Sequence, residues 1–331
     1  MLVKKCQEWN PDRIPPSIEV CELNNSDLSQ LAPKTFILLT TVGPYGRYGE
    51  HAFRACAENG THYADVTGEV PFTARMIAKY ASVAAATGAL MFPQIGIESC
   101  PSDLTAWSLA SQLRTTFGPA TQLREVVVSV RIRGAPSGGT LATALGMFDN
   151  FPFAEARESY KPFALSPVPN PRIARPRPSS MSLLARLTGL VRHPLLGLQT
   201  TSIANRTDGA IVERTWGLLE SVPVLKDQAY GPNFSFHQYM KAKGVLNGIS
   251  IHFGLMLLGV IMVTPFLRRF VAARVTQPGG GAELEQAKKE EIEYTAVGRP
   301  DVVEGAEGEG KEKLACSRVA YKGPLYYRKS W

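Results

Sequence analysis

The residues best suited to chemistry stand directly after apolar runs of the chain. Gly43-Pro44-Tyr45 follows the run FILLTTV, which contains Thr41, and Tyr48 comes three residues later. Asp65 ends the run THYAD. A glycine lets backbone approach a ligand closely, a carboxylate accepts hydrogen bonds from ribose hydroxyls, and a tyrosine can give up a proton. These residues suit the ribose or nicotinamide of a dinucleotide, but a tight turn would need the same glycine.

A second group of polar residues contains an acid and a nucleophile. Glu98, Ser99 and Asp103 lie close together in the sequence, but no histidine is placed to complete a catalytic triad. We favour Ser102 or Asp103 as the N-cap of the next helix. Glu69 has two interpretations, as an acceptor for a ligand hydroxyl and as a cap of the helix that follows it. Capping is favoured there as well.

Neither a metal site nor a secreted, disulfide-bonded protein is predicted. His51 and His62 have no cysteine or carboxylate at ligand spacing. The amino end carries no apolar segment of the kind found in secretory signals. The cysteines are odd in number and include no Cys-x-x-Cys pair, which predicts a reducing, intracellular compartment. They are Cys6, Cys21, Cys56, Cys100 and Cys316.

Composition predicts a folded protein of two domains. The chain has 331 residues, of which 44% are hydrophobic and 20% charged. A single core rarely grows beyond about 250 residues. The net charge is +7, but the basic residues recur beside apolar runs, around 172–192 and 268–274. This pattern favours an anionic membrane surface over nucleic acid as a partner.

Periodicity in the first 120 residues predicts alternating strands and helices. Short glycine-marked connections between them indicate right-handed crossovers and an α/β, doubly wound parallel sheet. The expected elements are a strand at 18–24, a turn of helix capped by Asp27, a buried strand at 36–42, a helix at 50–59, a strand at 61–66, a helix at 72–87 and a strand at 89–97.

The remaining residues, 121–331, predict a second domain of α+β type. A helix from Ser102 to about Arg114 leads into it. The expected features are a half-exposed strand at 125–133, a glycine-rich turn at 134–140, a helix at 141–148, a proline-rich surface connection at 162–180, an amphipathic helix at 183–191 and a flexible acidic loop at 278–313.

The run 249–267 is nearly uncharged and about as long as a bilayer-spanning helix. Gly254, Gly259 and Pro265 interrupt it, and basic residues flank both of its ends. A shallow hairpin or an interfacial anchor therefore fits better than a span. A core helix or an oligomer-interface helix is the alternative, because a run of this length is ambiguous.

The sequence contains a series of motifs: GPYxxYGE from Gly43, Ala55-Cys56, GTHYxDxTGE from Gly60, GIESxPSD from Gly96 and SGGT from Ser137. These motifs resemble those of the saccharopine dehydrogenase-like oxidoreductases, in particular the branch with trans-acting enoyl reductases, over about residues 15–275. The resemblance implies a Rossmann-type fold and NAD(P) bound near Thr41, Gly43, Pro44, Tyr45 and Asp65. Hydride transfer also needs one proton donor, for which Tyr45 and Tyr48 are the candidates.

Two departures from the family pattern accompany this resemblance. No strand leading into a glycine-rich turn precedes Ile18, and such a turn binds the pyrophosphate of a dinucleotide. VAYKGPLYY, from Val319, is similar to the last strand region of the family, but the expected closing helix does not follow. We therefore expect a chain truncated at both ends, with cofactor binding weakened or lost.

Two functions follow from the sequence. The first is an NAD(P)-dependent oxidoreductase of lipid or glycolipid metabolism with an apolar or lipid-linked substrate. The second is a non-catalytic protein that keeps the fold and associates with a membrane or lipid droplet through residues 249–267. Family kinship implies a lipid droplet, mitochondrial or plasma-membrane location. A homo-oligomer is a further expectation.

Overall fold

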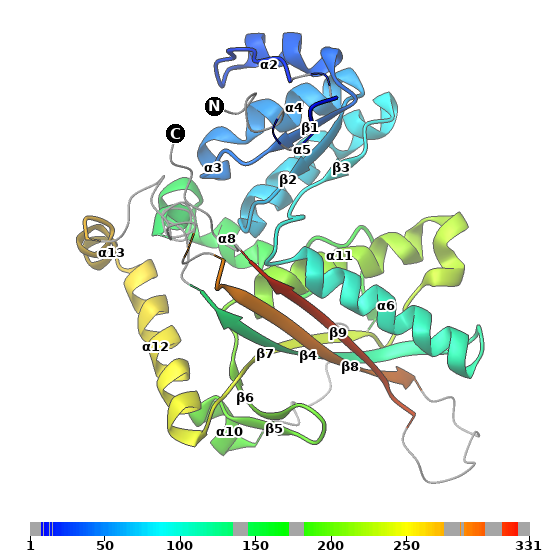
Figure 1. Ribbon diagram of the computed structural model, residues 1–331, viewed down its shortest axis with the longest axis vertical. Helices are drawn as coiled ribbons and strands as arrows, with labels where there is room; N and C mark the ends of the chain where they lie inside the picture. The colour runs from blue at the N-terminus through cyan, green and yellow to red at the C-terminus, as the bar shows by residue number, and fades with distance from the viewer. Residues whose placement is uncertain are drawn as a thin grey trace.

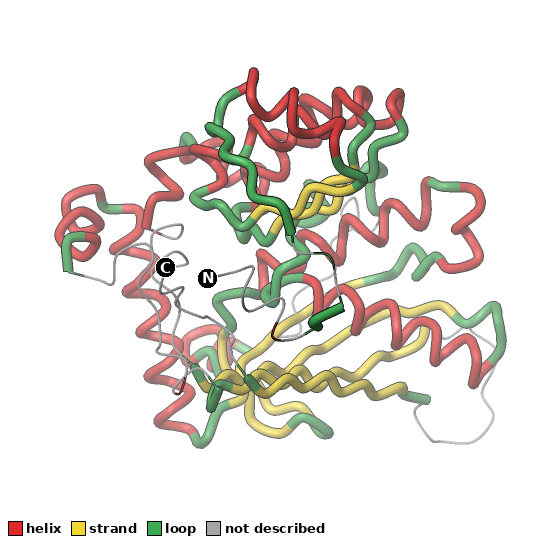
Figure 2. Tube along the Cα trace, turned by 45° about the horizontal axis from the view of Figure 1, so that its top comes forward, coloured by secondary structure: helices red, strands yellow, loops and turns green. Residues whose placement is uncertain are grey.

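The computed structural model describes residues 8, 10–12, 14, 16–134, 145–171, 182–274, 285, 288–301 and 313–323. Two β-sheets organise them, with the smaller sheet in the amino-terminal part of the chain and the larger one below it (Figure 1). The strands of the two sheets form separate layers, and helices lie between and around them (Figure 2). The predicted α/β class with a second α+β domain is confirmed.

The smaller sheet, called sheet A, is parallel and has the strand order β1-β2-β3. Its strands are β1 (Ile37–Thr40), β2 (His62–Asp65) and β3 (Met91–Phe92). The register places Leu38 beside Tyr63, and Tyr63 beside Met91. Each strand is shorter than predicted, because pairing stops where the chain turns into the loops at the carboxyl edge.

The crossover helices of sheet A pack on one of its faces. They are α3 (Tyr45–Tyr48), α4 (Glu50–Asn59) and α5 (Val70–Thr87), and Phe53 and Phe72 bury their rings with Tyr63 against this face. The predicted ends of α4 and α5 are confirmed, since Gly60 and Gly88 adopt the left-handed backbone conformation and cap them. This face holds the core of the first domain.

The other face of sheet A exposes apolar side chains. Ile37, Leu39 and Phe92 point to this side and are 38%, 68% and 48% exposed. Tyr63 and Met91 belong to the opposite, covered face and pack against the helices. Among the residues that the structure describes, the crossover helices therefore cover sheet A on one side.

Residues 18–24, predicted as a strand, are irregular and mostly exposed. The helix α2 (Asn25–Leu31) follows them, with the 3-10 helix η1 (Ala32–Lys34) after it. Its N-cap is Asn24, whose Oδ1 accepts a hydrogen bond from the Asp27 amide at 2.9 Å. The Asp27 carboxylate, the predicted cap, instead accepts from the Glu22 amide at 3.1 Å. The alternating pattern of residues 18–24 predicts a strand, but no neighbouring strand pairs with them in the described part of the chain.

The helix α6 (Cys100–Phe117) precedes the predicted domain boundary at residue 120 but packs against the larger sheet. Its apolar side, including Leu109 and Leu113, lies in the core of the second domain with Val126 and Val128. Gly298 is part of this packing, because a Cβ at its position would lie 3.1 Å from the Leu109 Cβ. The helix therefore belongs to the larger sheet.

The larger sheet, called sheet B, is mixed and has the strand order β5-β6-β7-β4-β8-β9. Its strands are β4 (Gln122–Arg133), β5 (Val191–His193), β6 (Gly197–Thr201), β7 (Ser235–Lys241), β8 (Glu291–Asp301) and β9 (Ala315–Lys322). The helices α6 and α11 (Asn205–Ser221) cover one face, and the 3-10 helix η2 (Pro223–Gln228) follows α11. The predicted strand 125–133 lies within β4.

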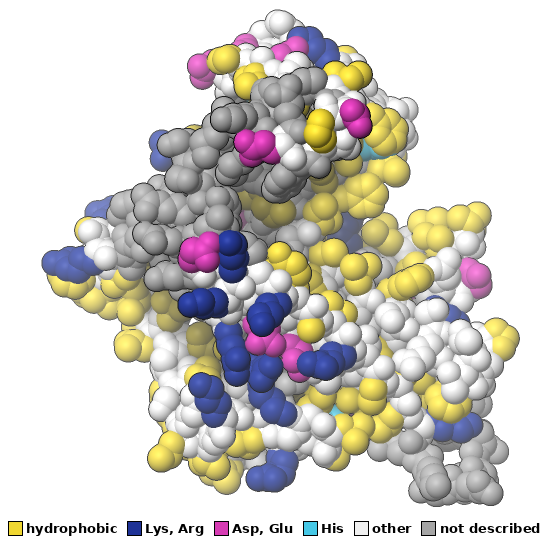
Figure 3. Space-filling model, in the orientation of Figure 1, with side chains coloured by type: hydrophobic (Ala, Val, Ile, Leu, Met, Phe, Trp, Pro, Cys, Tyr) yellow, Lys and Arg dark blue, Asp and Glu magenta, His cyan; other side chains and the backbone are white. Residues whose placement is uncertain are grey.

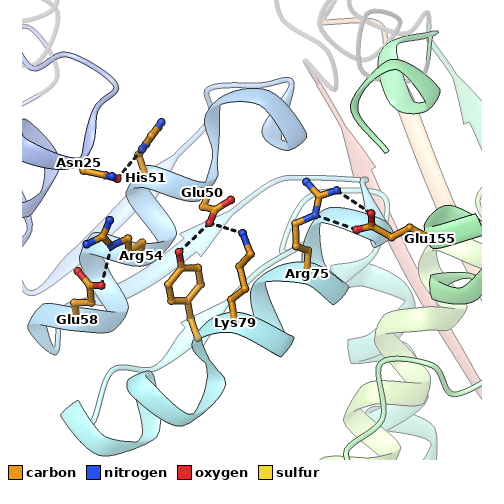
Figure 4. A network of polar contacts seen from close by, with 9 residues as sticks. Asn25, Glu50, His51, Arg54, Glu58, Arg75, Lys79 and Glu155 are labelled. Carbon is orange, nitrogen blue, oxygen red and sulfur yellow. Dashed lines mark hydrogen bonds and ion pairs between the residues drawn. The ribbon is translucent and has the colours of Figure 1, made fainter. Parts of the chain in front are cut away.

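Residues 145–160 return from the second domain to the first. The helical residues 145–150 and α8 (Phe153–Ser159) flank Phe151, which is buried with Tyr45 and Phe72. Arg75 of α5 forms a two-pronged ion pair with Glu155, with nitrogen-to-oxygen distances of 3.0 and 2.9 Å (Figure 4). Such forked pairs fix orientation, so this segment is firmly held on the first domain.

The helix α12 (Val245–Val263) packs on β6, and α10 (Leu183–Thr188) lies beside it. The helix α13 (Pro265–Ala272) continues from the far end of α12, away from β5 and β6 (Figure 1). The predicted apolar run 249–267 is thus two helices, divided at Thr264-Pro265, where proline begins the second. Part of the predicted flexible loop 278–313 differs in the structure, because residues 291–301 pair with β4 as the strand β8. The turn 135–140, residues 172–180 of the predicted connection, and residues 278–284, 286, 287 and 302–312 of the predicted loop lie outside the described residues.

Candidate functional site at the carboxyl edge of sheet A

The carboxyl ends of β1, β2 and β3 open into three neighbouring loops. These loops contain the sequence motifs that begin at Gly43, Asp65 and Gly96. The Ile95 amide donates to the Asp65 carbonyl oxygen at 2.9 Å, and a Cβ at Gly96 would lie 3.2 Å from that of Val66. Ligands of open α/β sheets bind in the crevice outside this edge. The structure therefore brings the three predicted motifs together.

Glu69 organises the loop after β1. Its carboxylate accepts hydrogen bonds from the Tyr45 amide at 2.7 Å and from the Gly46 amide at 2.8 Å. Burial raises the pKa of Glu69, and these two backbone bonds oppose the shift. The prediction that Glu69 caps its own helix is wrong in this respect: it stands at the N-cap position of α5, but its side chain satisfies the first amides of α3.

Asp65 organises the loops after β2 and β3. It accepts hydrogen bonds from the Tyr63 hydroxyl at 2.8 Å, from the Gln94 amide at 2.8 Å and from the Thr67 amide at 3.0 Å. Burial raises the pKa of Asp65, against the effect of these three donors. The carboxylate is buried and used internally, so the structure gives Asp65 a positioning role instead of the predicted contact with a ribose hydroxyl.

The two predicted proton donors differ in their surroundings. The Tyr45 hydroxyl donates to the Thr40 carbonyl at 2.9 Å and accepts from the Val66 amide at 3.4 Å. Burial raises the pKa of Tyr45, and the charge of Asp65 adds to the shift. This hydroxyl is directed into the protein, toward the backbone of Thr40 and Val66. Tyr48 is half-buried, with the Arg47 guanidinium 5.1 Å from its ring centre.

The predicted backbone contacts of a cofactor lie at the open side of the edge. Thr41 and Gly43 are exposed at the end of β1, and Pro44 is half-buried before α3. Val42, Val66 and Ile95 follow the three strands and are all exposed. We call these three side chains the apolar ledge. Gly96, packed on Val66, leaves room that a larger residue would fill.

Glu98 also lies at this edge, although the sequence analysis considered it only as a member of an incomplete catalytic triad. A Cβ at Gly68 would lie 2.8 Å from its Oε2, so the glycine makes room for the carboxylate. Among the described residues, no hydrogen bond or ion pair engages Glu98. Burial raises its pKa. Burial also raises the pKa of Tyr160 to about 12, and the charge of Glu98 adds to that shift.

The acid and hydroxyl groups at the start of α6 bind to α11 and β7 within the second domain. Ser102 donates to the Asp208 carboxylate at 2.7 Å, and the Gln238 side-chain nitrogen donates to Ser102 at 3.2 Å. Thr215 donates to the Asp103 carboxylate at 2.8 Å. The prediction that Ser102 or Asp103 caps α6 is therefore wrong. The N-cap is Ser99, which forms no side-chain cap bond.

A metal centre finds no support in the described residues, in which no group of three or more His, Cys, Asp or Glu side chains is placed to hold an ion. His51 binds Asn25 at 2.7 Å on the surface of the first domain (Figure 4). The Leu90 amide donates to His62 at 3.1 Å. Both histidines have structural partners.

The edge fits one half of a dinucleotide. Exposed backbone at Thr41 and Gly43 suits a ribose, and the apolar ledge suits a planar nicotinamide ring. In the described part of the chain, no strand and glycine-rich loop precede β1, since residues 16–24 are irregular. Among the described residues, the edge thus offers surface suited to a nicotinamide and its ribose but no glycine-rich loop suited to a pyrophosphate.

Comparison with known proteins finds mycobacterial relatives. A Mycobacterium tuberculosis protein provisionally named trans-acting enoyl reductase is 37% identical over 221 residues, which are 65% of this chain and 50% of the relative. The trans-acting enoyl reductase of Mycobacterium leprae is 40% identical over 109 residues, 33% of this chain and 25% of its own. This chain thus spans half or less of their lengths. No protein-family model matches it.

Among solved structures, apo histidine-tagged saccharopine dehydrogenase (L-Glu forming) from Saccharomyces cerevisiae aligns over 97% of this chain and 79% of its own. The TM-score is 0.39 and the identity 9%.

Sheet A, its crossover helices and the loops at its carboxyl edge define an α/β protein. The motifs in those loops and the mycobacterial relatives place the chain more closely. Its sequence is similar to that of the trans-acting enoyl reductases, and the predicted resemblance to this branch of oxidoreductases is confirmed.

Proposed function

We propose that this protein is an NAD(P)-dependent oxidoreductase that reduces an apolar or lipid-linked substrate in lipid or glycolipid metabolism. The observation that carries the proposal is the meeting of the three motif loops at the carboxyl edge of sheet A, where exposed backbone and the apolar ledge adjoin. The relatives are named for enoyl reduction, which supports an unsaturated acyl substrate. An intracellular membrane location follows from the same substrate class.

In this proposal the protein's residues bind and orient the ligands and move one proton. The chemistry that a nicotinamide supplies when bound is hydride transfer. Thr41 and Gly43 hold the ribose through backbone groups, and the apolar ledge excludes water from the ring. Asp65 and Glu69 keep the loops in place through the hydrogen bonds described above.

We assign the proton donor to Glu98. It lies at the carboxyl edge beside Gly68, and no described side chain engages its carboxyl group. A carboxyl group in such surroundings stays protonated more readily than one in water. Tyr48 is the alternative donor, because Tyr45 is occupied by the Thr40 carbonyl.

The first test is cofactor binding by the whole chain. We expect saturable quenching of protein fluorescence by NADPH or NADH, and we expect Val66→Asp to weaken it at least about tenfold, because a charge replaces apolar surface on the ledge. Val224→Asp is the matched control, since Val224 is exposed on η2. Absence of quenching by a chain that is folded by circular dichroism would remove the enzyme assignment.

The second test separates the two proton donors, with a long-chain 2-enoyl thioester as the probe substrate. Glu98→Gln is expected to lower turnover about 10²- to 10⁴-fold with cofactor binding intact, because the amide has no acidic proton. Tyr48→Phe is expected to keep most of the turnover and the wild-type pH profile. The opposite result would assign the proton to Tyr48.

A non-catalytic, membrane-associated protein that keeps the fold is the second candidate function. The exposed helix α12 and the internal use of Asp65 and Tyr45 favour it. Membrane binding without any binding of NADPH or NADH would select this function.

A further inference from the structure

The helices α10, α12 and α13 expose apolar side chains outside the candidate site. The helix α12 is long and apolar enough to cross a membrane. An 18-residue stretch of it has a mean hydropathy of 1.9, and only 6% of that stretch is buried in the protein. Its exposed side chains include Leu246, Phe253, Leu257 and Val260, which recur at intervals of seven, four and three residues. They therefore form one stripe along the helix.

The first half of α12 is fixed to sheet B. Thr200 of β6 donates to the Gly248 carbonyl at 2.7 Å, and the Thr201 hydroxyl and His252 Nδ1 are 2.8 Å apart. Gly248 is buried at this contact, since a Cβ there would collide with Leu190. This end of the helix cannot leave the sheet without exposing these polar groups.

The other end of α12 is fixed to residues 145–150. Arg268 of α13 is almost fully buried and forms an ion pair with Asp149. It also donates to the Met262 carbonyl, in the last turn of α12, at 2.8 Å. Residues 145–150 continue into Phe151, which lies in the core of the first domain. Arg268 is buried although Asp149 is half-exposed, so breaking the pair would leave a buried guanidinium without its carboxylate, which is costly.

These two attachments indicate whether α12 crosses a bilayer or lies in the plane of its surface. A helix of 19 residues is about 28 Å long, close to the apolar thickness of a bilayer. If α12 crossed a bilayer, its two ends would lie on opposite sides. Both ends are bonded to the same body, so crossing would require loss of the contacts of Thr200, Thr201 or Arg268. An in-plane helix keeps all of them.

Charge indicates the kind of surface that these helices meet. Of the charged residues in the three helices, Arg186 and Arg269 are exposed, Arg268 is paired with Asp149, and none is a carboxylate. Exposed Lys243 and Arg274 flank α12 and α13. Figure 3 shows basic side chains beside hydrophobic ones over α13 and the adjoining end of α12. Self-association through this surface would bring like charges together, whereas an anionic leaflet complements them.

We propose that α10, α12 and α13 form a monotopic membrane-binding surface, on which α12 lies in the plane of an anionic lipid leaflet with its exposed stripe among the acyl chains. The proposal goes beyond the assignment as an oxidoreductase and does not depend on cofactor binding. It also places both domains on one side of the membrane.

The test is flotation of the full chain with vesicles of phosphatidylcholine mixed with phosphatidylserine. Leu257→Glu is expected to weaken binding at least about tenfold, and the matched control Val224→Glu to leave it unchanged. Arg186→Gln and Arg269→Gln are each expected to weaken binding about fivefold, an effect that vanishes with pure phosphatidylcholine. The Arg variants also serve if Leu257→Glu does not fold.

The in-plane position is tested with lipids that carry a quenching label at a shallow or a deep acyl position. Tryptophan is introduced as Leu246→Trp, Phe253→Trp and Val263→Trp, and the added fluorescence is compared with the wild-type chain. We expect similar, shallow quenching at all three positions. Deep quenching at Phe253→Trp with none at the two ends would show a span and overturn the proposal. So would failure to float, or a dimer that Leu257→Glu converts to monomers without any lipid binding.

Discussion

Sheets A and B are each packed against helices on one face, but their other faces differ. The second face of sheet A bears Ile37, Leu39 and Phe92, all exposed. That of sheet B bears ion pairs, such as the pair of Arg299 and Glu125 at 3.0 Å. Figure 3 shows basic and acidic side chains gathered over β4, β8 and β9.

This difference follows from how each sheet is connected. Sheet B is mainly antiparallel, and such sheets commonly keep one polar, solvated face. Sheet A is parallel, and parallel strands carry apolar side chains on both faces because helices usually cover both. The second face of sheet A is therefore apolar and that of sheet B is charged, although both of these faces meet solvent. The predictions below test this contrast.

The largest effect is expected from the covered face of sheet A. Phe72→Ala removes a ring that packs with Tyr45 and Phe53, and we expect a loss of about 3–5 kcal/mol in the free energy of unfolding. Leu39→Ala, on the exposed face, is expected to change it by less than about 1 kcal/mol. Urea denaturation measures both. Equal losses would show that the second face of sheet A is also covered in solution.

An intermediate effect is expected from the helical cover of sheet B. Burial raises the pKa of Asp103 on α6 to about 7, although Thr215 donates to it. The folded protein then binds more protons than the unfolded chain between about pH 4 and 7, so stability falls as the pH rises through this window and levels off above it.

The corresponding variant is Asp103→Asn. Relative to it, the wild-type chain is expected to lose roughly 2–3 kcal/mol between pH 5 and pH 8. Asp12→Asn, at an exposed position, serves as the control with a wild-type profile. Urea denaturation across this pH range gives the difference. Parallel profiles for wild type and Asp103→Asn would contradict the expectation. Glu213, whose pKa burial also raises to about 7, contributes a slope of the same sign to both chains.

The smallest effect is expected from the charged face of sheet B. Arg299→Ala removes the partly exposed pair with Glu125, and the free energy of unfolding is expected to fall by about 0.2–1 kcal/mol. The loss should shrink further in high salt, because screening weakens such pairs. A loss as large as that of Phe72→Ala would show that this face is buried in solution.

The elements whose signals are local were predicted well. Gly60 and Gly88 end α4 and α5 as expected, because a left-handed residue at a helix end is a property of the residue itself. The strand predicted at residues 18–24 is absent, because an alternating sequence forms a strand only where a partner strand lies beside it. The packing of α6 on sheet B did not follow from the sequence either, since the side of α6 that faces sheet B depends on where that sheet lies.

The candidate site shows the same division. The motifs at Gly43, Asp65 and Gly96 were found from sequence, and their meeting at one edge followed from parallel strands. The roles of their side chains did not follow. A carboxylate can cap a helix, hold a loop or contact a ligand with the same neighbours in sequence, and Glu69 and Asp65 each perform a task other than the expected one.

The sequence by itself determined the resemblance to trans-acting enoyl reductases, the alternation of strands and helices, and the presence of one long apolar segment. These properties depend on residue type and short-range spacing. Only the tertiary structure decided that Glu69 serves α3, that Glu98 lies beside Gly68, and that both ends of α12 are attached to one body. The bond between Arg268 and Asp149 joins residues far apart in the chain. Such partners are set by which loops and helices meet in space, a property that no local pattern of residues records.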